Sequence, residues 1–254
     1  MHTIMVLNAK GGSGKTTIAT TLACYFAGQG YNTSLMDHDP QHSSGHWLSI
    51  RNDNQPKITS INAVRPKSGL TRSFQLYGGC GTDITIMDTP AGITGGQLSD
   101  LFNKADTIII PIMASVIDLH AARGFISEMM RMGKHRLHGK RLGLIANRVR
   151  SADSAYESIE KLAEETDIPV IASLRDSRNY TIAMESGLGI CEQKHYHNSK
   201  DHKQWEAIYE WLMDVIPPKE LPIESVAIMP EQEKVERSTK QSSWDFSEGN
   251  MAIS

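Results

Sequence analysis

Residues 7–17 read LNAKGGSGKTT and directly follow the apolar run Ile4-Met5-Val6. A buried strand that breaks into a glycine-rich loop and then opens a helix is the arrangement of a phosphate-binding loop. The glycines let the backbone take conformations that a side chain disfavours, so successive N–H groups can converge on phosphate oxygens. The helix that begins near Lys15 adds the positive end of its dipole. This stretch therefore predicts a nucleotide phosphate site.

Two side chains of this loop carry the expected chemistry. Lys15 places a positive charge on the β- and γ-phosphates, and the Thr16 hydroxyl is a ligand for Mg²⁺. The strict pattern has glycine at its first position, where this chain has Ala9, but the remaining GxGK[ST] core is intact. The alternative, a glycine-rich turn before an ordinary helix, leaves the GKTT segment unexplained.

The charge of the chain is uneven along its length. The formal net charge is −3, and residues 218–254 hold four Lys/Arg against seven Asp/Glu, which leaves residues 1–217 neutral. Nucleic-acid binding therefore requires a local basic patch. Because Pro, Glu, Lys, Ser and Gln dominate after Pro217, we expect a P-loop ATPase domain over 1–217 and a disordered acidic tail over 218–254.

Cysteine usage and hydropathy indicate the compartment. Cys24, Cys80 and Cys191 are widely spaced, which predicts neither a disulfide framework nor a CxxC metal site. No apolar run approaches the roughly 18 residues that span a bilayer. Free thiols together with a nucleotide loop favour a cytoplasmic protein.

Two acids follow the predicted strand 33–36. Asp37 and Asp39 are two residues apart on an extended segment, so their side chains point the same way, and Pro40 ends the strand. Beside a magnesium-bound triphosphate, one acid would be linked to the metal and the other would orient the attacking water. The alternative is a solvated loop end, since Asp-Pro is common in turns.

A third acid ends the predicted strand 82–88. An Asp at the end of a buried strand beside a phosphate loop is the usual partner of the magnesium, which predicts that role for Asp88. The glycine-rich segment 91–96 would then rearrange with the γ-phosphate, as switch loops do. A core strand that simply ends in a surface turn is the alternative.

Strands and helices alternate along the rest of the chain, and residues 42–56 carry no clear pattern. The expected strands are 4–6, 33–36, 57–64, 82–88, 105–111, 141–147 and 168–172, and the expected helices are 16–29, 68–76, 116–133, 153–166, 179–186 and 203–216. This alternation predicts an α/β fold with a single doubly wound, mainly parallel sheet and helices on both faces.

Four segments together resemble the ParA/MinD group of P-loop ATPases, whose phosphate loop is a deviant Walker A motif. They are AKGGSGKTT at 9–17, LMDHDPQ at 35–41, ITIMDTPAG at 84–92 and ANR at 146–148. The resemblance covers the body to about Ile216 and leaves the tail outside. Members of the family commonly carry Val at the position of Ser13, which a small residue can replace.

The resemblance implies a role for each matched residue. Lys10 corresponds to the signature lysine, which in an ATP-bound sandwich homodimer reaches the partner's phosphates and stabilises charge on the transferred phosphoryl group. Asn147 would read the adenine, or alternatively cap a turn. The catalytic set is Lys10, Lys15 and Asp39. The expected magnesium residues are Thr16, Asp37 and Asp88. The expected nucleotide contacts are Lys10, Gly11, Gly12, Ser13, Gly14, Lys15, Thr16, Thr17 and Asn147.

Relatives within this group differ in what they bind. The acidic, interrupted segment 242–249 is unlike a basic amphipathic membrane helix, so we expect no membrane binding. The cysteines are not placed for the paired-cysteine cluster of nitrogenase-reductase-like members, and the tail lacks the tyrosines of the bacterial tyrosine kinases. What remains is the ParA branch, which implies binding of nonspecific double-stranded DNA by the ATP-bound dimer.

A local basic run is present despite the neutral body. Residues 129–152 contain seven Lys/Arg and no acid, so they could contact phosphates without reading sequence. Ordinary solubilising charge is the alternative. The candidate DNA contacts, some of them chosen by family position, are Arg148, Arg150, Arg175, Arg178 and Lys203.

The function that the resemblance implies is ATP-driven positioning on the nucleoid. A ParB-like or cargo-specific adaptor would stimulate slow ATP hydrolysis and move a plasmid, a chromosome locus or a protein body such as a carboxysome. The compact body and the acidic tail favour a protein cargo. The alternatives are a client-loading or maturation factor that uses the same dimer without DNA, and a nucleotide-gated scaffold with negligible turnover.

Overall fold

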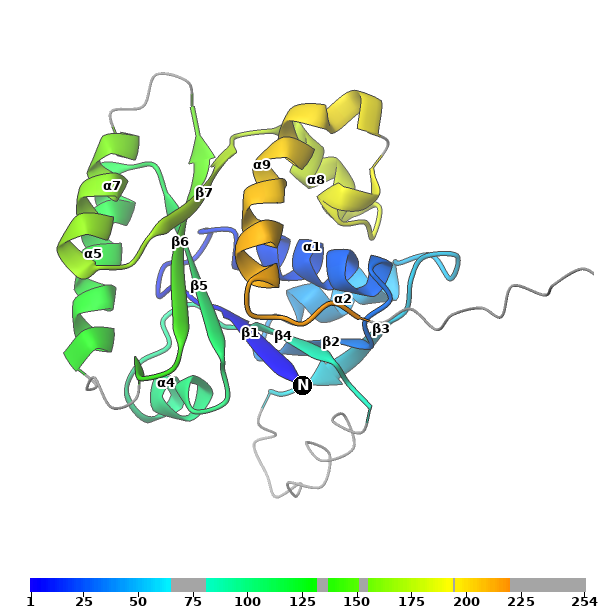
Figure 1. Ribbon diagram of the computed structural model, residues 1–254, viewed down its shortest axis with the longest axis horizontal. Helices are drawn as coiled ribbons and strands as arrows, with labels where there is room; N and C mark the ends of the chain where they lie inside the picture. Colours follow the sequence, from blue (N-terminus) through cyan, green and yellow to red (C-terminus); the bar gives the residue numbers. More distant parts are fainter. Residues whose placement is uncertain (65–80, 132–136, 151–154, 194, 220–254) are drawn as a thin grey trace, which may run out of the picture. The chain divides into compact units, whose positions relative to one another are not determined.

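The computed structural model describes residues 1–64, 81–131, 137–150, 155–193 and 195–219 (Figure 1). Within these ranges seven parallel strands form one sheet in the order β3-β2-β4-β1-β5-β6-β7. The strands are β1 (His2–Val6), β2 (Thr33–Asp37), β3 (Ile58–Asn62), β4 (Ile84–Asp88), β5 (Thr107–Met113), β6 (Arg141–Val149) and β7 (Val170–Arg175). The predicted doubly wound α/β fold is confirmed, and β1 lies at its centre.

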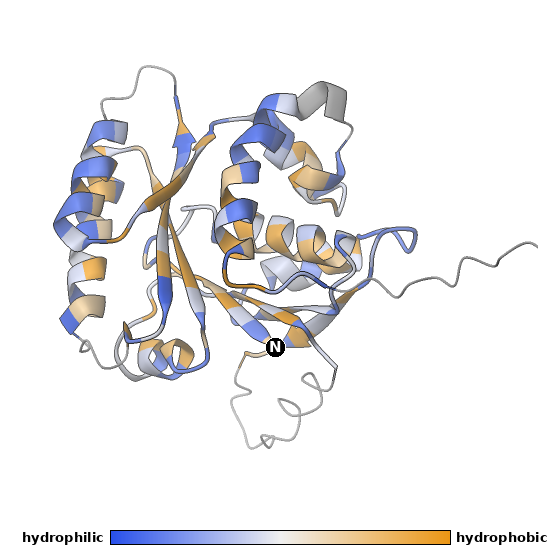
Figure 2. Ribbon diagram, in the orientation of Figure 1, coloured by the Kyte–Doolittle hydropathy of each residue, from blue (hydrophilic) through white to orange (hydrophobic). Residues whose placement is uncertain are grey.

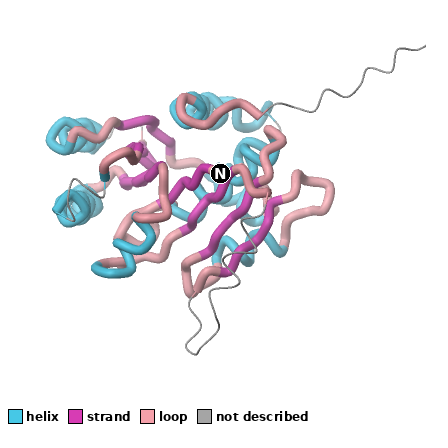
Figure 3. Tube along the Cα trace, turned by 60° about the horizontal axis from the view of Figure 1, so that its bottom comes forward, coloured by secondary structure: helices cyan, strands magenta, loops and turns pink. Residues whose placement is uncertain are grey.

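Helices cover both faces of the sheet, as the ribbon and tube views show (Figures 1 and 3). They are α1 (Lys15–Gly28), α2 (Ser43–Ser49), α4 (Gly95–Phe102), α5 (Val116–Arg131), α7 (Ala155–Thr166), α8 (Arg178–Glu185), α9 (His195–Met213) and the short 3-10 helix η1 (Ile190–Glu192). None of the helices in the described ranges is long and apolar enough to cross a membrane.

Strand β1 explains why the strands read as continuous apolar runs. Its alternate residues Ile4 and Val6 pack in one core cluster with α1, α2 and α9, while Met5 and Leu7 pack in a second cluster with α4, α5 and α7. All four side chains are fully buried. A parallel strand covered on both faces needs apolar residues at every position, and Figure 2 shows the sheet strands largely hydrophobic.

Several predicted boundaries were wrong. Helix α9 begins at His195, eight residues before the predicted start at 203, because its first turns are polar and carry no apolar stripe. Strand β6 continues to Val149 and β7 to Arg175, beyond the predicted ends. Helix 68–76 lies outside the described residues, as does the tail from residue 220 onward, so the tail remains a prediction.

Two short helices were not predicted. Helix α2 buries only Ser44 and Trp47, too few residues to give a periodic pattern. Helix α4 opens on two glycines, Gly95 and Gly96, which ordinarily indicate a turn. Both helices follow a strand that ends in an acid. Helix α2 also contacts one of these acids, because the Gly45 N–H donates to the Asp37 carboxylate.

Candidate nucleotide site

The phosphate loop connects β1 to α1 at the centre of the sheet's carboxyl edge. Gly12 and Gly14 have φ angles of 77° and 94°, in the left-handed region where a side chain is strained. Gly14 is the N-cap of α1 and has a second constraint, because a Cβ there would lie 2.2 Å from Nδ2 of Asn147. The structure therefore explains why glycine is needed at this position.

Asn147 ties the end of β6 to the phosphate loop. Its Nδ2 donates to the Ser13 carbonyl at 2.8 Å, and its Oδ1 accepts from the Arg148 backbone N–H at 3.0 Å. The side chain is almost fully buried. In this structure the amide supports the loop, and its predicted contact with adenine stays a prediction.

Lys15 lies within the loop and is 7% exposed. Its Nζ donates to the Lys10 carbonyl at 3.1 Å. Burial lowers the pKa of this ammonium group, and the nearby Asp88 and Asp39 carboxylates oppose that shift. A phosphate oxygen could replace the carbonyl as the acceptor, which is the contact that the loop pattern predicts.

The three predicted acids are together at the carboxyl ends of β2 and β4. Asp37 and Asp88 are direct partners in the register of these two strands. The Asp37 oxygens accept backbone hydrogen bonds from Asp39 at 2.9 Å and Gly45 at 3.0 Å, so this carboxylate is already satisfied. Asp39 is less buried and accepts from the Gln41 backbone N–H at 2.9 Å.

Asp88 is buried and unsatisfied. The side chain has 0% exposure, and neither of its oxygens has a hydrogen-bond partner of good geometry among the described residues. Burial raises its pKa to about 7, Asp37 adds to the rise, and the Thr16 and Ser44 hydroxyls with Lys15 oppose it. Buried carboxylates without partners indicate a missing cation or its water shell. The donor set of Asp88 and Thr16 therefore fits Mg²⁺.

Lys10 stands at the mouth of the site. Its side chain is 44% exposed, and its Nζ lies 3.9 Å from Oδ1 of Asp118 in the first turn of α5. Asp118 is itself hydrogen bonded to Ser115. The single chain thus places Lys10 beside an acid of its own, and its predicted role as the signature lysine stays a prediction. Asp118 is not among the predicted site residues, although an acid in the first turn of a helix, where it interacts favourably with the helix dipole, can be identified from the sequence.

The segment after β4 is attached to the phosphate loop. The Thr89 hydroxyl donates to the Val6 carbonyl at 2.8 Å, and the Gly92 N–H donates to the Ala9 carbonyl at 2.8 Å. A movement of the loop on binding phosphate would therefore be transmitted to residues 89–92. The switch-loop role of residues 91–96 stays a prediction.

Three of the five predicted DNA-contacting residues pair with acids, and all but Arg175 are exposed. Arg175 makes two bonds to the fully buried Asp201, at 2.6 and 2.8 Å, which anchors α9 to β7. Arg148 and Arg150 each lie 3.1 Å from the Asp176 carboxylate. Arg178 and Lys203 are exposed. Residues 132–136 of the basic run lie outside the described residues.

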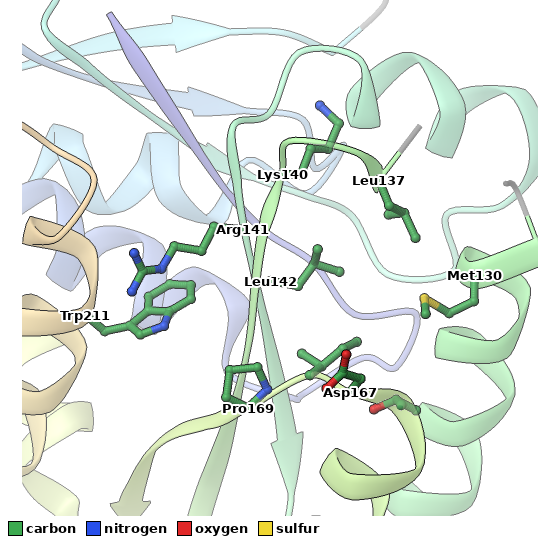
Figure 4. Close-up of a pocket in the computed structure, with 10 residues that line it drawn as sticks. Met130, Leu137, Lys140, Arg141, Leu142, Asp167, Pro169 and Trp211 are labelled. Carbon is green, nitrogen blue, oxygen red and sulfur yellow. The ribbon is translucent and has the colours of Figure 1, made fainter. Parts of the chain in front are cut away.

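A separate hollow of about 400 Å³ lies at the opposite edge of the sheet, where β6 and β7 begin (Figure 4). Arg141, which lines this hollow, already has two partners. Its guanidinium lies over the Trp211 ring, 4.4 Å from the ring centroid, and it pairs with Asp214 at 2.9 Å. Lys140 donates to the Ala105 carbonyl. This hollow is therefore not the nucleotide site.

Replacing Asp39 with alanine is expected to lower ATP turnover about 100-fold, the usual scale for a residue that positions a reacting water. ATP affinity should change by no more than a few-fold, because other residues hold the phosphates. Steady-state hydrolysis and equilibrium ATP binding measure the two effects. Asp53→Ala in an exposed turn is the control. Unchanged turnover in Asp39→Ala would show that another group orients the water.

Comparisons with known proteins identify the family. Residues 4–190 match the CobQ/CobB/MinD/ParA nucleotide binding domain. Maintenance of carboxysome distribution protein A from Halothiobacillus neapolitanus is 25% identical over 219 residues, covering 85% of this chain and 96% of that protein.

Solved structures agree on the fold. Apo McdA from Cyanothece matches with a TM-score of 0.64 and 19% identity, over 84% of this chain and 99% of that one. MinD from Aquifex aeolicus matches with a TM-score of 0.65 and 16% identity, over 87% and 100% of the two chains. With a phosphate loop, a buried strand acid and this matched domain together, the chain belongs to the CobQ/CobB/MinD/ParA nucleotide-binding family and is a P-loop ATPase of the ParA/MinD type.

Proposed function

We propose that this ATPase dimerises with ATP, binds nonspecific double-stranded DNA of the nucleoid, and positions a cargo through slow, adaptor-stimulated hydrolysis. The observation that carries the proposal is Lys10, whose side chain is 44% exposed at the mouth of the nucleotide site, beside Asp118. Lys15 is buried beside the loop and can serve the chain's own phosphates, which leaves the exposed Lys10 available for the phosphates of a second copy.

Each residue of the nucleotide site has its own role in the proposed hydrolysis of ATP. The loop N–H groups and Lys15 bind the phosphates, Asp39 orients the attacking water, and Lys10 reaches the phosphates of the second copy. Asp37, Asp88 and Thr16 would hold Mg²⁺. When bound, magnesium neutralises charge on the β- and γ-phosphates.

A protein cargo is favoured over a plasmid or a chromosome locus. The relative from Halothiobacillus neapolitanus is named for the maintenance of carboxysome distribution, and it aligns over most of its length. We propose a protein body such as a carboxysome as the cargo, linked to the ATPase by a cargo-specific adaptor.

Binding to random duplex DNA tests the proposal. We expect binding that requires ATP and weakens steeply with salt, because phosphate contacts release counterions. Arg178→Ala and Lys203→Ala, which remove exposed cations, should each reduce the salt slope by about one. Fluorescence anisotropy over a salt series measures both effects. Lys161→Ala, on the exposed face of α7, is the control.

Two results would contradict the proposal. If no ATP-dependent DNA binding occurs at low salt, the protein is not a nucleoid-bound ATPase, and a client-loading factor becomes the better hypothesis. If ATP does not change the sedimentation of the chain from monomer to dimer, the exposed Lys10 has no partner to reach.

A further inference from the structure

One buried hydroxyl beside the acids belongs to no role assigned above. Ser44 lies in the first turn of α2 and has 0% exposure, and its Oγ has no hydrogen-bond partner of good geometry in the part of the chain that the structure describes. A buried hydroxyl that makes no hydrogen bond is destabilising. A buried hydroxyl of this kind indicates a role other than stabilising the fold.

Helix α2 holds Ser44 in a defined place. At its start, the Gly45 N–H donates to Oδ2 of Asp37 at 3.0 Å, and a Cβ on Gly45 would lie 3.4 Å from the same oxygen. Farther along, Trp47 is buried in the core cluster that contains α1 and β1. The helix is therefore fixed at both ends, and Ser44 is fixed with it.

The neighbour of Ser44 is the other unsatisfied group of the site. Asp88 has two buried oxygens without hydrogen-bond partners of good geometry among the described residues, and the Ser44 hydroxyl, which also has none, is near enough to interact with them. Asp37, whose backbone contact positions α2, is the cross-strand partner of Asp88. Two buried polar groups without good hydrogen-bond partners thus lie near each other, one at the start of α2 and one at the carboxyl end of β4.

We infer that Ser44 is a positioning residue of the magnesium site, whose hydroxyl donates to one Asp88 oxygen and leaves the other for a metal-bound water. The inference rests on the proposed use of Mg-ATP. The small reorientation of the hydroxyl that a good hydrogen bond needs is available to a serine, because its O–H rotates freely. Thr16, the other hydroxyl that interacts with Asp88, is the direct ligand in this proposal.

The test is the magnesium dependence of ATP binding by Ser44→Ala. We expect the free Mg²⁺ concentration for half-maximal ATP binding to rise about tenfold, the scale of one hydrogen bond to a charged group. ATP binding in EDTA should be unchanged, because Ser44 does not touch the nucleotide. Isothermal titration calorimetry measures both. A merely structural defect would weaken both arms equally. Ser49→Ala, exposed at the end of the same helix, is the matched control.

The outcomes separate this inference from the proposed function. If the wild type requires Mg²⁺ for tight ATP binding and Ser44→Ala requires it at the same concentration, the inference is wrong and the function stands. If Ser44→Ala loses affinity equally with and without Mg²⁺, Ser44 is structural and the inference is wrong. If the wild type binds ATP without regard to Mg²⁺, the proposed function and the inference both fail.

Discussion

The substitution Lys10→Ala is expected to reduce ATP turnover by about 10³-fold, because the variant loses a cation that acts across the dimer on the transferred phosphoryl group. ATP binding to the single chain should be nearly unchanged, since Lys15 and the loop N–H groups remain. The exposed position of Lys10 carries this expectation: its side chain contacts Asp118 only at 3.9 Å, so leaving that contact for a partner's phosphates costs little.

Single-turnover hydrolysis and sedimentation with ATP would measure the effect of Lys10→Ala, with Lys161→Ala as the control for loss of one surface lysine. The variant should remain monomeric with ATP at concentrations where the wild type dimerises. If instead Lys10→Ala dimerises and hydrolyses ATP as the wild type does, the lysine is a surface residue and the resemblance has assigned it the wrong role.

Much of the fold could be predicted from the sequence because the strands are buried on both faces. The run Ile108-Ile109-Ile110 and the alternation of Ile4, Met5 and Val6 between two core clusters are typical of a covered parallel sheet. The phosphate loop then fixed β1 and α1, since its glycines and Lys15 allow few other structures.

Polar and short elements could not be predicted in the same way. Helix α9 opens with His195-Tyr196-His197-Asn198, a sequence without an apolar stripe, so its start was placed too late. Helix α2 owes its position to the Gly45 N–H bond with Asp37 and to one buried tryptophan. Such helices depend on tertiary contacts that periodicity does not reveal.

The candidate site shows the same division. Lys15, Thr16, Asp37 and Asp88 lie together, because parallel strands bring their carboxyl ends to one edge of the sheet. The acids that pair with Lys10 and with the candidate DNA-contacting arginines could not be predicted from the sequence. Asp201 forms an ion pair with Arg175, Asp176 forms ion pairs with Arg148 and Arg150, and Asp118 lies beside Lys10. Each pair joins residues far apart in the chain, and no local pattern specifies it.

The substitution Asp88→Asn is expected to stabilise the nucleotide-free protein at pH 8 by roughly 2–4 kcal/mol. Burial raises the pKa of Asp88 to about 7 in the folded chain, whereas in the unfolded chain this carboxyl has its ordinary pKa of 3.8. Between these values the folded state binds more protons, so stability falls as pH rises from about 4 to about 7 and remains reduced above. Asn is neutral at every pH and avoids this loss.

Urea unfolding of Asp88→Asn and the wild type, without nucleotide or Mg²⁺, would measure the difference at pH 8 and at pH 4.5, where it should fall to about a quarter of its value at pH 8. Asp37→Asn is the matched control, because its carboxylate accepts two backbone hydrogen bonds and its loss should destabilise. The added stability of Asp88→Asn should come with loss of stabilisation by Mg-ATP, since the site gives up its metal-binding charge. If Asp88→Asn is less stable than the wild type at pH 8, the folded chain stabilises the charged Asp88 carboxylate by more than burial destabilises it, and the expected gain in stability is wrong.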